Sequence, residues 1–201
     1  VGSGGLKNPL KAAGGPPLLS ADGRVRFVYV GAEFCPYCAA ERWSVVVALS
    51  RFGTLSGLQL TTSSSSDIYP NTPTFTFQKA ALTSTFVAFE STETQTRTGA
   101  PLQNPTSEQL ALIQKYDPAG SIPFVDVGNV AVAVGSGYLP DVLGGKSWPD
   151  VAAELSAGSS PLARSVLGNA NWLTAAICKA GGDKAPVCAD PNLRGLESQL
   201  G

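Results

Sequence analysis

Two cysteines three positions apart, Cys35 and Cys38, are the residues of this chain whose types and spacing point most clearly to chemistry. An apolar, strand-like run at residues 24–30 precedes them, and residues 39–50 contain good helix formers. A cysteine at a helix N-terminus faces unpaired backbone N–H groups, which favour its thiolate. We therefore predict that Cys35 is a nucleophile and that Cys38, one helical turn further on, resolves the mixed disulfides that Cys35 forms.

A second pattern lies at residues 121–135, which read SIPFVDVGNVAVAVG. Two apolar segments, 124–127 and 130–134, flank a Gly-Asn pair, which is typical of a β-hairpin. Together with AEFCPYC, this segment resembles the thioredoxin superfamily, in which a cis-proline facing the CxxC motif opens the third core strand. The resemblance implies that the Ile122–Pro123 bond is cis and lies beside the two cysteines.

The resemblance also implies a fold and a binding surface. We expect an α/β thioredoxin-like domain over residues 24–201, after a flexible N-terminal tether formed by residues 1–23. The groove for client proteins would be formed by Pro36, Tyr37, Ile122 and Pro123, and the backbone of Ile122 would pair with an extended client segment. The wider pattern, including NANWLTAAIC, is similar to an uncharacterised extracytoplasmic thioredoxin-like family, domain of unknown function 929.

The chain departs from thioredoxins near the dithiol. Thioredoxins carry a buried acid six residues before the first cysteine, whereas this chain has Tyr29 there. Glu33 and Glu41 are the nearest carboxylates that could take over the proton relay, but we interpret both as solvated surface charges. Arg42 could stabilise a thiolate by folding back over the site, although an exposed helix arginine is the interpretation we favour.

A β-rich insertion, at about residues 60–105, separates the CxxC helix from the cis-proline strand. Residues 58–61 are predicted to complete a core strand, and alternation at 74–77 and 85–89 predicts two extra strands. Their phenylalanines either pack a small satellite core, which we favour, or form a lid or groove for a client polypeptide. These phenylalanines are Phe75, Phe77, Phe86 and Phe89.

Three helix starts follow. Thr106 and Gln109 have the spacing of a capping box for a helix that runs to Tyr116. Residues 147–150 start a second helix through Leu155, and residues 160–161 start a third that ends at Cys178. The third helix opens a C-terminal extension at about residues 159–201.

Cys178 and Cys188 are close enough in sequence to join a helix end to the C-terminal tail. We predict a structural disulfide between them. The alternatives are a second redox pair that relays electrons to Cys35, or a zinc site built from all four cysteines. The second pair lacks the short knuckle spacing of zinc ribbons, and we predict neither a metal nor a cofactor.

Composition limits the classes of function. The chain has 201 residues, a formal net charge of −1 and no basic patch, which argues against nucleic acid as a partner. It contains no histidine, which excludes Ser-His-Asp triads and Cys-His nucleophile pairs. Without a run of eighteen apolar residues, the sequence is not expected to span a membrane.

These observations predict an extracytoplasmic thiol:disulfide oxidoreductase, acting as oxidase, isomerase or reductase on client proteins with an unknown redox partner. The chain lacks methionine, from which we expect a removed or separate leader or membrane anchor. One alternative is a binding or assembly module in which Cys35 and Cys38 form a permanent structural disulfide. A glutathione-dependent glutaredoxin-type transferase and a copper-handling protein are further, less favoured alternatives.

Overall fold

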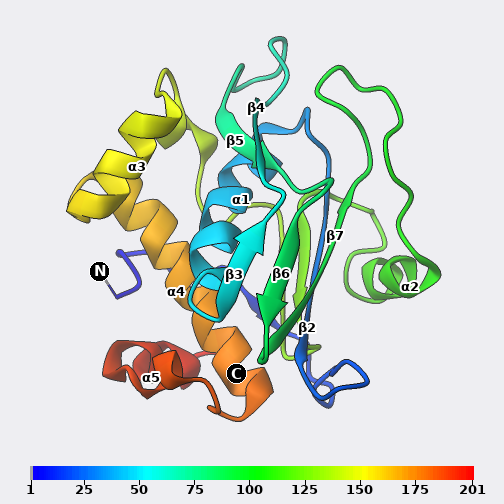
Figure 1. Ribbon diagram of the computed structural model, residues 1–201, viewed down its shortest axis with the longest axis vertical. Helices are drawn as coiled ribbons and strands as arrows, with labels where there is room; N and C mark the ends of the chain where they lie inside the picture. The colour runs from blue at the N-terminus through cyan, green and yellow to red at the C-terminus, as the bar shows by residue number, and fades with distance from the viewer. Residues whose placement is uncertain (1) are drawn as a thin grey trace.

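The computed structural model describes residues 2–201 (Figure 1). Its centre is a five-stranded mixed sheet with the strand order β1-β9-β8-β2-β7. The strand β2 (Val25–Gly31) pairs in parallel with β7 (Val87–Glu93) and antiparallel with β8 (Phe124–Val127). The antiparallel strands β9 (Ala131–Val134) and β1 (Lys11–Ala12) complete the sheet. Because β2 and β7 are parallel, their carboxyl ends lie at the same end of the sheet.

Helices cover both faces of this sheet (Figure 1). The α-helices are α1 (Pro36–Leu49), α2 (Ser107–Tyr116), α3 (Trp148–Ala157), α4 (Pro161–Gly181) and α5 (Pro191–Glu197), and the short 3-10 helices are η1 (Pro140–Leu143) and η2 (Pro186–Ala189). Phe27 and Tyr29 of β2 pack into a core shared with α1 and α4, whereas Val28 and Val30 pack on the side of α2. The two pairs lie on opposite faces because successive side chains of a β-strand point to opposite sides of the sheet.

The predicted helix starts are confirmed. Thr106 Oγ1 accepts a hydrogen bond from Gln109 N at 3.2 Å, and Gln109 Oε1 accepts one from Thr106 N at 3.0 Å. Ser147 and Asp150 form a second capping box at the start of α3, and the Ser160 side chain caps α4. Each cap satisfies backbone N–H groups that a helix leaves unpaired at its first turn.

The predicted hairpin is also confirmed. Between β8 and β9 the chain turns at Gly128 and Asn129, which have φ angles of 57° and 56°. Two successive positive φ angles match the twist of a two-stranded ribbon, and glycine and asparagine tolerate them best. The hairpin places the first residue of β8 directly after Pro123.

Four short strands lie between α1 and β7 in two separate two-stranded sheets: β3 (Gly53–Ser56) with β6 (Ala81–Ser84), and β4 (Gln59–Thr62) with β5 (Pro73–Thr76). The prediction that residues 58–61 complete the core sheet is therefore wrong. The parallel neighbour of β2 is instead β7, which includes part of the predicted extra strand 85–89. Val87 is fully buried whereas Leu60 is 63% exposed, so burial of apolar surface favours β7 as the core strand.

The insertion phenylalanines do not form a separate satellite core. Phe77 contacts Tyr29 of β2 edge to face, with ring centroids 5.0 Å apart, and Phe89 at 5.3 Å. Phe75 contacts Trp43 of α1 at a centroid distance of 4.5 Å. Phe86 also packs against the main core. The inserted strands are thereby fixed to the main sheet and to α1 by aromatic contacts.

The N-terminal segment differs from the predicted tether. Lys11 and Ala12 form the edge strand β1, and Leu10 is buried in the main core. Leu18 N donates to Gly128 O at 2.7 Å, and Leu18 O accepts from Arg26 N at 3.1 Å. The segment carries no periodic pattern because it contributes single buried side chains and backbone hydrogen bonds instead of an amphipathic element.

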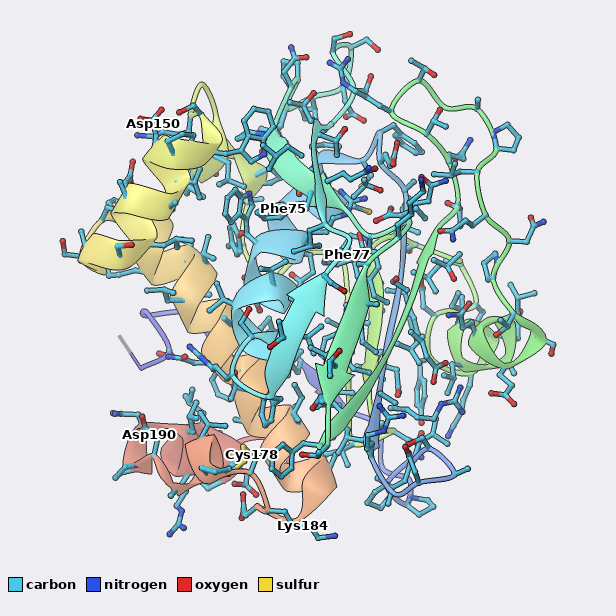
Figure 2. The ribbon with its side chains drawn as sticks, viewed as in Figure 1. Phe75, Phe77, Asp150, Cys178, Lys184 and Asp190 are labelled. Atoms are coloured by element: carbon cyan, nitrogen blue, oxygen red, sulfur yellow. A yellow bond between two sulfur atoms is a disulfide. The ribbon has the colours of Figure 1, made fainter. Side chains whose placement is uncertain are left out.

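The predicted disulfide between Cys178 and Cys188 is present. It joins the last turn of α4 to η2, and both cysteines are 2% exposed. Figure 2 shows Cys178 between α4 and α5, at the end of the molecule formed by the C-terminal helices. The bond therefore ties the C-terminal segment to the helix that packs on the main sheet.

Replacement of Cys178 and Cys188 together by serine is expected to lower the free energy of unfolding by about 2–3 kcal/mol, because the bond restricts the unfolded chain. Chemical denaturation of the double variant beside the wild-type protein measures this loss, and thiol exchange at Cys35 is expected to continue. Unchanged stability combined with loss of re-oxidation or re-reduction would favour the electron relay instead.

Candidate active site

The dithiol lies where β2 passes into α1. β2 ends at Gly31, and Cys35 is the N-cap residue of α1, with extended backbone angles of φ −74° and ψ 122°. Pro36 occupies the first helical position, where no intrahelical N–H bond is lost. The local sequence thus fixes Cys35 at the helix N-terminus, as predicted, and Cys38 in the first turn.

The two thiols have different environments. Cys35 Sγ accepts a hydrogen bond from Cys38 N at 3.3 Å. A hydrogen bond from the Cys38 thiol, followed by backbone N–H groups and the charge of Arg42, lowers the pKa of Cys35 against the opposing effect of burial. Burial raises the pKa of Cys38 well above its usual value, and the hydrogen bond to Cys35 adds to this. Cys35 is therefore the thiol that ionises first.

The second sequence motif meets the first here. The Ile122–Pro123 bond is cis, as the resemblance implies. Ile122 O lies 4.0 Å from Cys35 Sγ, although 87 positions separate the two residues along the chain. The hairpin β8-β9 therefore brings its entry segment to the N-terminus of α1, beside the dithiol.

An open polar groove adjoins the CxxC motif. Its lining includes Phe34, Ser64, Ile68 and Arg97. Within the CxxC motif, the ring of Tyr37 contacts that of Tyr69 edge to face, with centroids 5.9 Å apart. The inserted loop between β4 and β5 therefore stands next to Tyr37, so it is positioned to contact any molecule that reaches Cys35.

The charged residues near the dithiol are not placed as predicted. Glu41 and Arg42 are both fully buried, and neither is the solvated side chain that we expect from the sequence. Glu33 is half-buried, and its carboxylate accepts a hydrogen bond from Arg97 N at 3.2 Å. The reason is that α1 packs against α4, η1 and β5, which leaves little of the helix in solvent.

Arg42 forms an ion pair with Glu93 at the carboxyl end of β7, and both side chains are fully buried. Tyr29, six residues before Cys35, is buried beside them with its ring centroid 5.8 Å from Arg42 Cζ. The sequence analysis does not identify Glu93, because the parallel pairing of β7 with β2 is needed to place it beside α1. The buried carboxylate that pairs with Arg42 thus comes from a strand that the sequence assigns to an insertion.

These features define a mixed α/β protein that carries a vicinal dithiol at a helix N-terminus, next to a cis-proline. Residues 15–179 match the model of the family described as Domain of unknown function (DUF929), and the chain belongs to this family, as the sequence pattern predicts. No curated protein and no solved structure matches the chain. Among residues 2–201, no helix has the length and apolar character needed to cross a bilayer.

Proposed function

We propose that this protein is a thiol:disulfide oxidoreductase with a thioredoxin-like fold that acts on cysteines of client proteins. One observation carries the proposal: Cys35 caps α1 and its sulfur lies 4.0 Å from the carbonyl oxygen of the cis Ile122–Pro123 unit. The topology supports it as well, since β8 follows the cis-proline directly and pairs with β2, the strand that precedes the CxxC motif.

The reaction uses the two thiols in sequence. The Cys35 thiolate attacks one sulfur of a client disulfide, so that a Cys35–client bond forms and the second client sulfur leaves as a thiolate that takes up a proton. Cys38 then attacks the Cys35 sulfur, and the first client sulfur leaves. Two electrons pass from the dithiol to the client, and the reverse sequence oxidises a client dithiol. The direction depends on the redox partner.

Client recognition is assigned to the surface beside Cys35. Pro36 and Tyr37 separate the two cysteines of the CxxC motif, and Ile122 and Pro123 share the cis peptide unit whose carbonyl oxygen lies 4.0 Å from Cys35 Sγ. An extended client segment that pairs with the Ile122 backbone would bring its sulfur to Cys35. The Cys178–Cys188 disulfide supports a location outside the cytoplasm, where such bonds persist.

A redox titration tests the proposal. An active dithiol stabilised as the Cys35 thiolate is expected to have a reduction potential between about −230 and −120 mV, whereas a structural disulfide falls below about −300 mV. The measurement equilibrates the protein with glutathione buffers and counts the free thiols of Cys35 and Cys38. A potential in the structural range, with no exchange with a reduced test protein, would favour a binding module instead.

A further inference from the structure

A buried ion pair lies next to the dithiol. The Arg42 guanidinium donates from Nε to Glu93 Oε1 at 2.8 Å and from Nη2 to Glu93 Oε2 at 2.6 Å. Glu93 Oε1 also accepts from Phe77 N at 3.2 Å. Burying both charges carries a considerable desolvation penalty, so the presence of this ion pair needs an explanation.

The position of the pair relates it to Cys38. Arg42 follows Cys38 by four residues on α1, which places both on one face of the helix. Arg42 Nη2 donates to Ala32 O at 2.8 Å, and the Ala32 backbone also interacts with the sulfur of Cys38. One residue, Ala32, therefore contacts both the guanidinium and the resolving thiol through its backbone.

Two buried donors in this cluster are left unpartnered. Within the part of the chain that the structure describes, Arg42 Nη1 and the Tyr29 hydroxyl have no hydrogen-bond partner. A buried donor without a partner is costly, so each such group calls for a structural or functional explanation. The Tyr29 hydroxyl occupies the space that a side chain on Gly31 would need, so the glycine leaves room for it.

Four titratable or charged groups surround Cys38, and their charges differ in sign. They are Cys35 and Arg42 on α1, Tyr29 on β2 and Glu93 on β7, which is linked to Cys38 through its ion pair with Arg42. Burial and the Cys35 thiolate both raise the pKa of Cys38, and the charge of Arg42 acts in the opposite direction. Among these four groups, the guanidinium is the cation.

We propose that Arg42, held by Glu93, is a positioning residue that stabilises the thiolate of Cys38 while Cys38 resolves a mixed disulfide. The inference rests on the proposed function and concerns its second step. In that step Cys38 releases its proton to solvent, and the thiolate attacks the Cys35 sulfur. The Cys35–client bond breaks, the Cys35–Cys38 bond forms, and the departing client thiolate takes up a proton from solvent. Thioredoxins carry a buried acid at the position of Tyr29, which helps to move the proton of the second thiol. In this protein the Arg42 cation would favour the Cys38 thiolate electrostatically instead.

The test measures the pKa of Cys38 directly. In a Cys35→Ala background with the Cys178–Cys188 bond intact, Cys38 is the remaining free thiol, and NMR of isotope-labelled cysteine follows its ionisation. Arg42→Met is expected to raise the Cys38 pKa by about one unit or more. Glu93→Gln is expected to lower it, because the guanidinium then loses its counter-charge. A purely structural ion pair would not produce shifts of opposite sign.

Each single variant leaves one buried charge unpaired and can fail to fold. In that case the Cys38 pKa is measured in the double variant Arg42→Met/Glu93→Gln instead. It has no buried charge in the pair and is expected to show a raised Cys38 pKa. The matched control is Arg26→Met, which breaks the ion pairs of Arg26, near the start of β2, with Glu90 of β7 and Glu108 of α2. This control is expected to leave the Cys38 pKa unchanged.

Kinetics supply the second readout. Resolution of a Cys35–glutathione mixed disulfide is expected to slow about threefold for each unit of increase in the Cys38 pKa, since the smaller thiolate fraction outweighs its greater nucleophilicity. A wild-type Cys38 pKa in the double variant, or shifts of the same sign in both single variants, would overturn the inference. The pKa measurement needs no client, so a wild-type protein inactive on test proteins would overturn the proposed function alone.

Discussion

Replacement of Cys35 by serine is expected to abolish thiol exchange, with turnover on a disulfide-containing test protein falling to the background rate. Cys35 is the sulfur that caps α1 and has the lowered pKa, whereas Cys38 is fully buried and its pKa is raised. A serine hydroxyl can accept the same backbone hydrogen bond but cannot form a disulfide. The assay measures reduction of the test protein by the pre-reduced variant.

Cys38→Ser is the matched variant, and its expected result is different. Cys35 can still attack, but no resolving thiol follows, so mixed disulfides with the test protein accumulate and are visible on a non-reducing gel. Alkylation of the reduced wild-type protein at mildly acidic pH is expected to label Cys35 first. Equal labelling of both thiols, or trapping by Cys35→Ser instead, would reverse the two roles.

The local part of this site could be predicted from the sequence. The strand, the CPYC motif and the following helix are contiguous, so their order alone places Cys35 at a helix N-terminus. The capping box of Thr106 and Gln109 likewise depends only on residues three positions apart. The cis bond before Pro123 could be anticipated only through the resemblance, because sequence spacing gives no information on peptide isomers.

The buried charges could not be predicted in this way. On an isolated helix, Glu41 and Arg42 lie among polar and apolar neighbours with no clear face, and either could point to solvent. Their burial depends on α4 and the inserted strand β5, which approach α1 from distant parts of the chain. Glu93 cannot be found from the sequence for a related reason, since the sequence pattern assigns its segment to an insertion and not to the core sheet.

Glu41 provides the second prediction with a large effect. Its carboxylate is fully buried, and Oε2 accepts from Gly137 N at 3.1 Å and from Asn169 Nδ2 at 2.8 Å. Burial outweighs these two hydrogen bonds and raises the pKa of Glu41 from 4.5 to about 7. Within residues 2–201, Oε1 has no hydrogen-bond partner, so the ionised form is poorly compensated.

The raised pKa determines the sign of the pH dependence. Between pH about 4.5 and 7 the folded protein retains a proton on Glu41 that the unfolded chain has lost, so the stability falls as the pH rises through this range. The loss amounts to about 3 kcal/mol once the pH exceeds the folded-state pKa. Glu41→Gln keeps an oxygen for Gly137 and Asn169 but cannot ionise, so it is expected to be more stable than wild type above pH 7 by up to this amount.

Denaturant unfolding of both proteins across this pH range measures the effect as a difference. The buried carboxyl of Asp126 also has a raised pKa, about 6, but it is common to both proteins and cancels. Glu154→Gln is the control. A hydrogen bond from Lys146 lowers the pKa of this half-buried carboxyl, so its contribution to the pH dependence of stability falls below pH 4.5. If Glu41→Gln kept the wild-type slope between pH 4.5 and 7, the Glu41 carboxylate would have to be solvated or paired in solution, and the close packing of α1 against α4 at this point would be wrong.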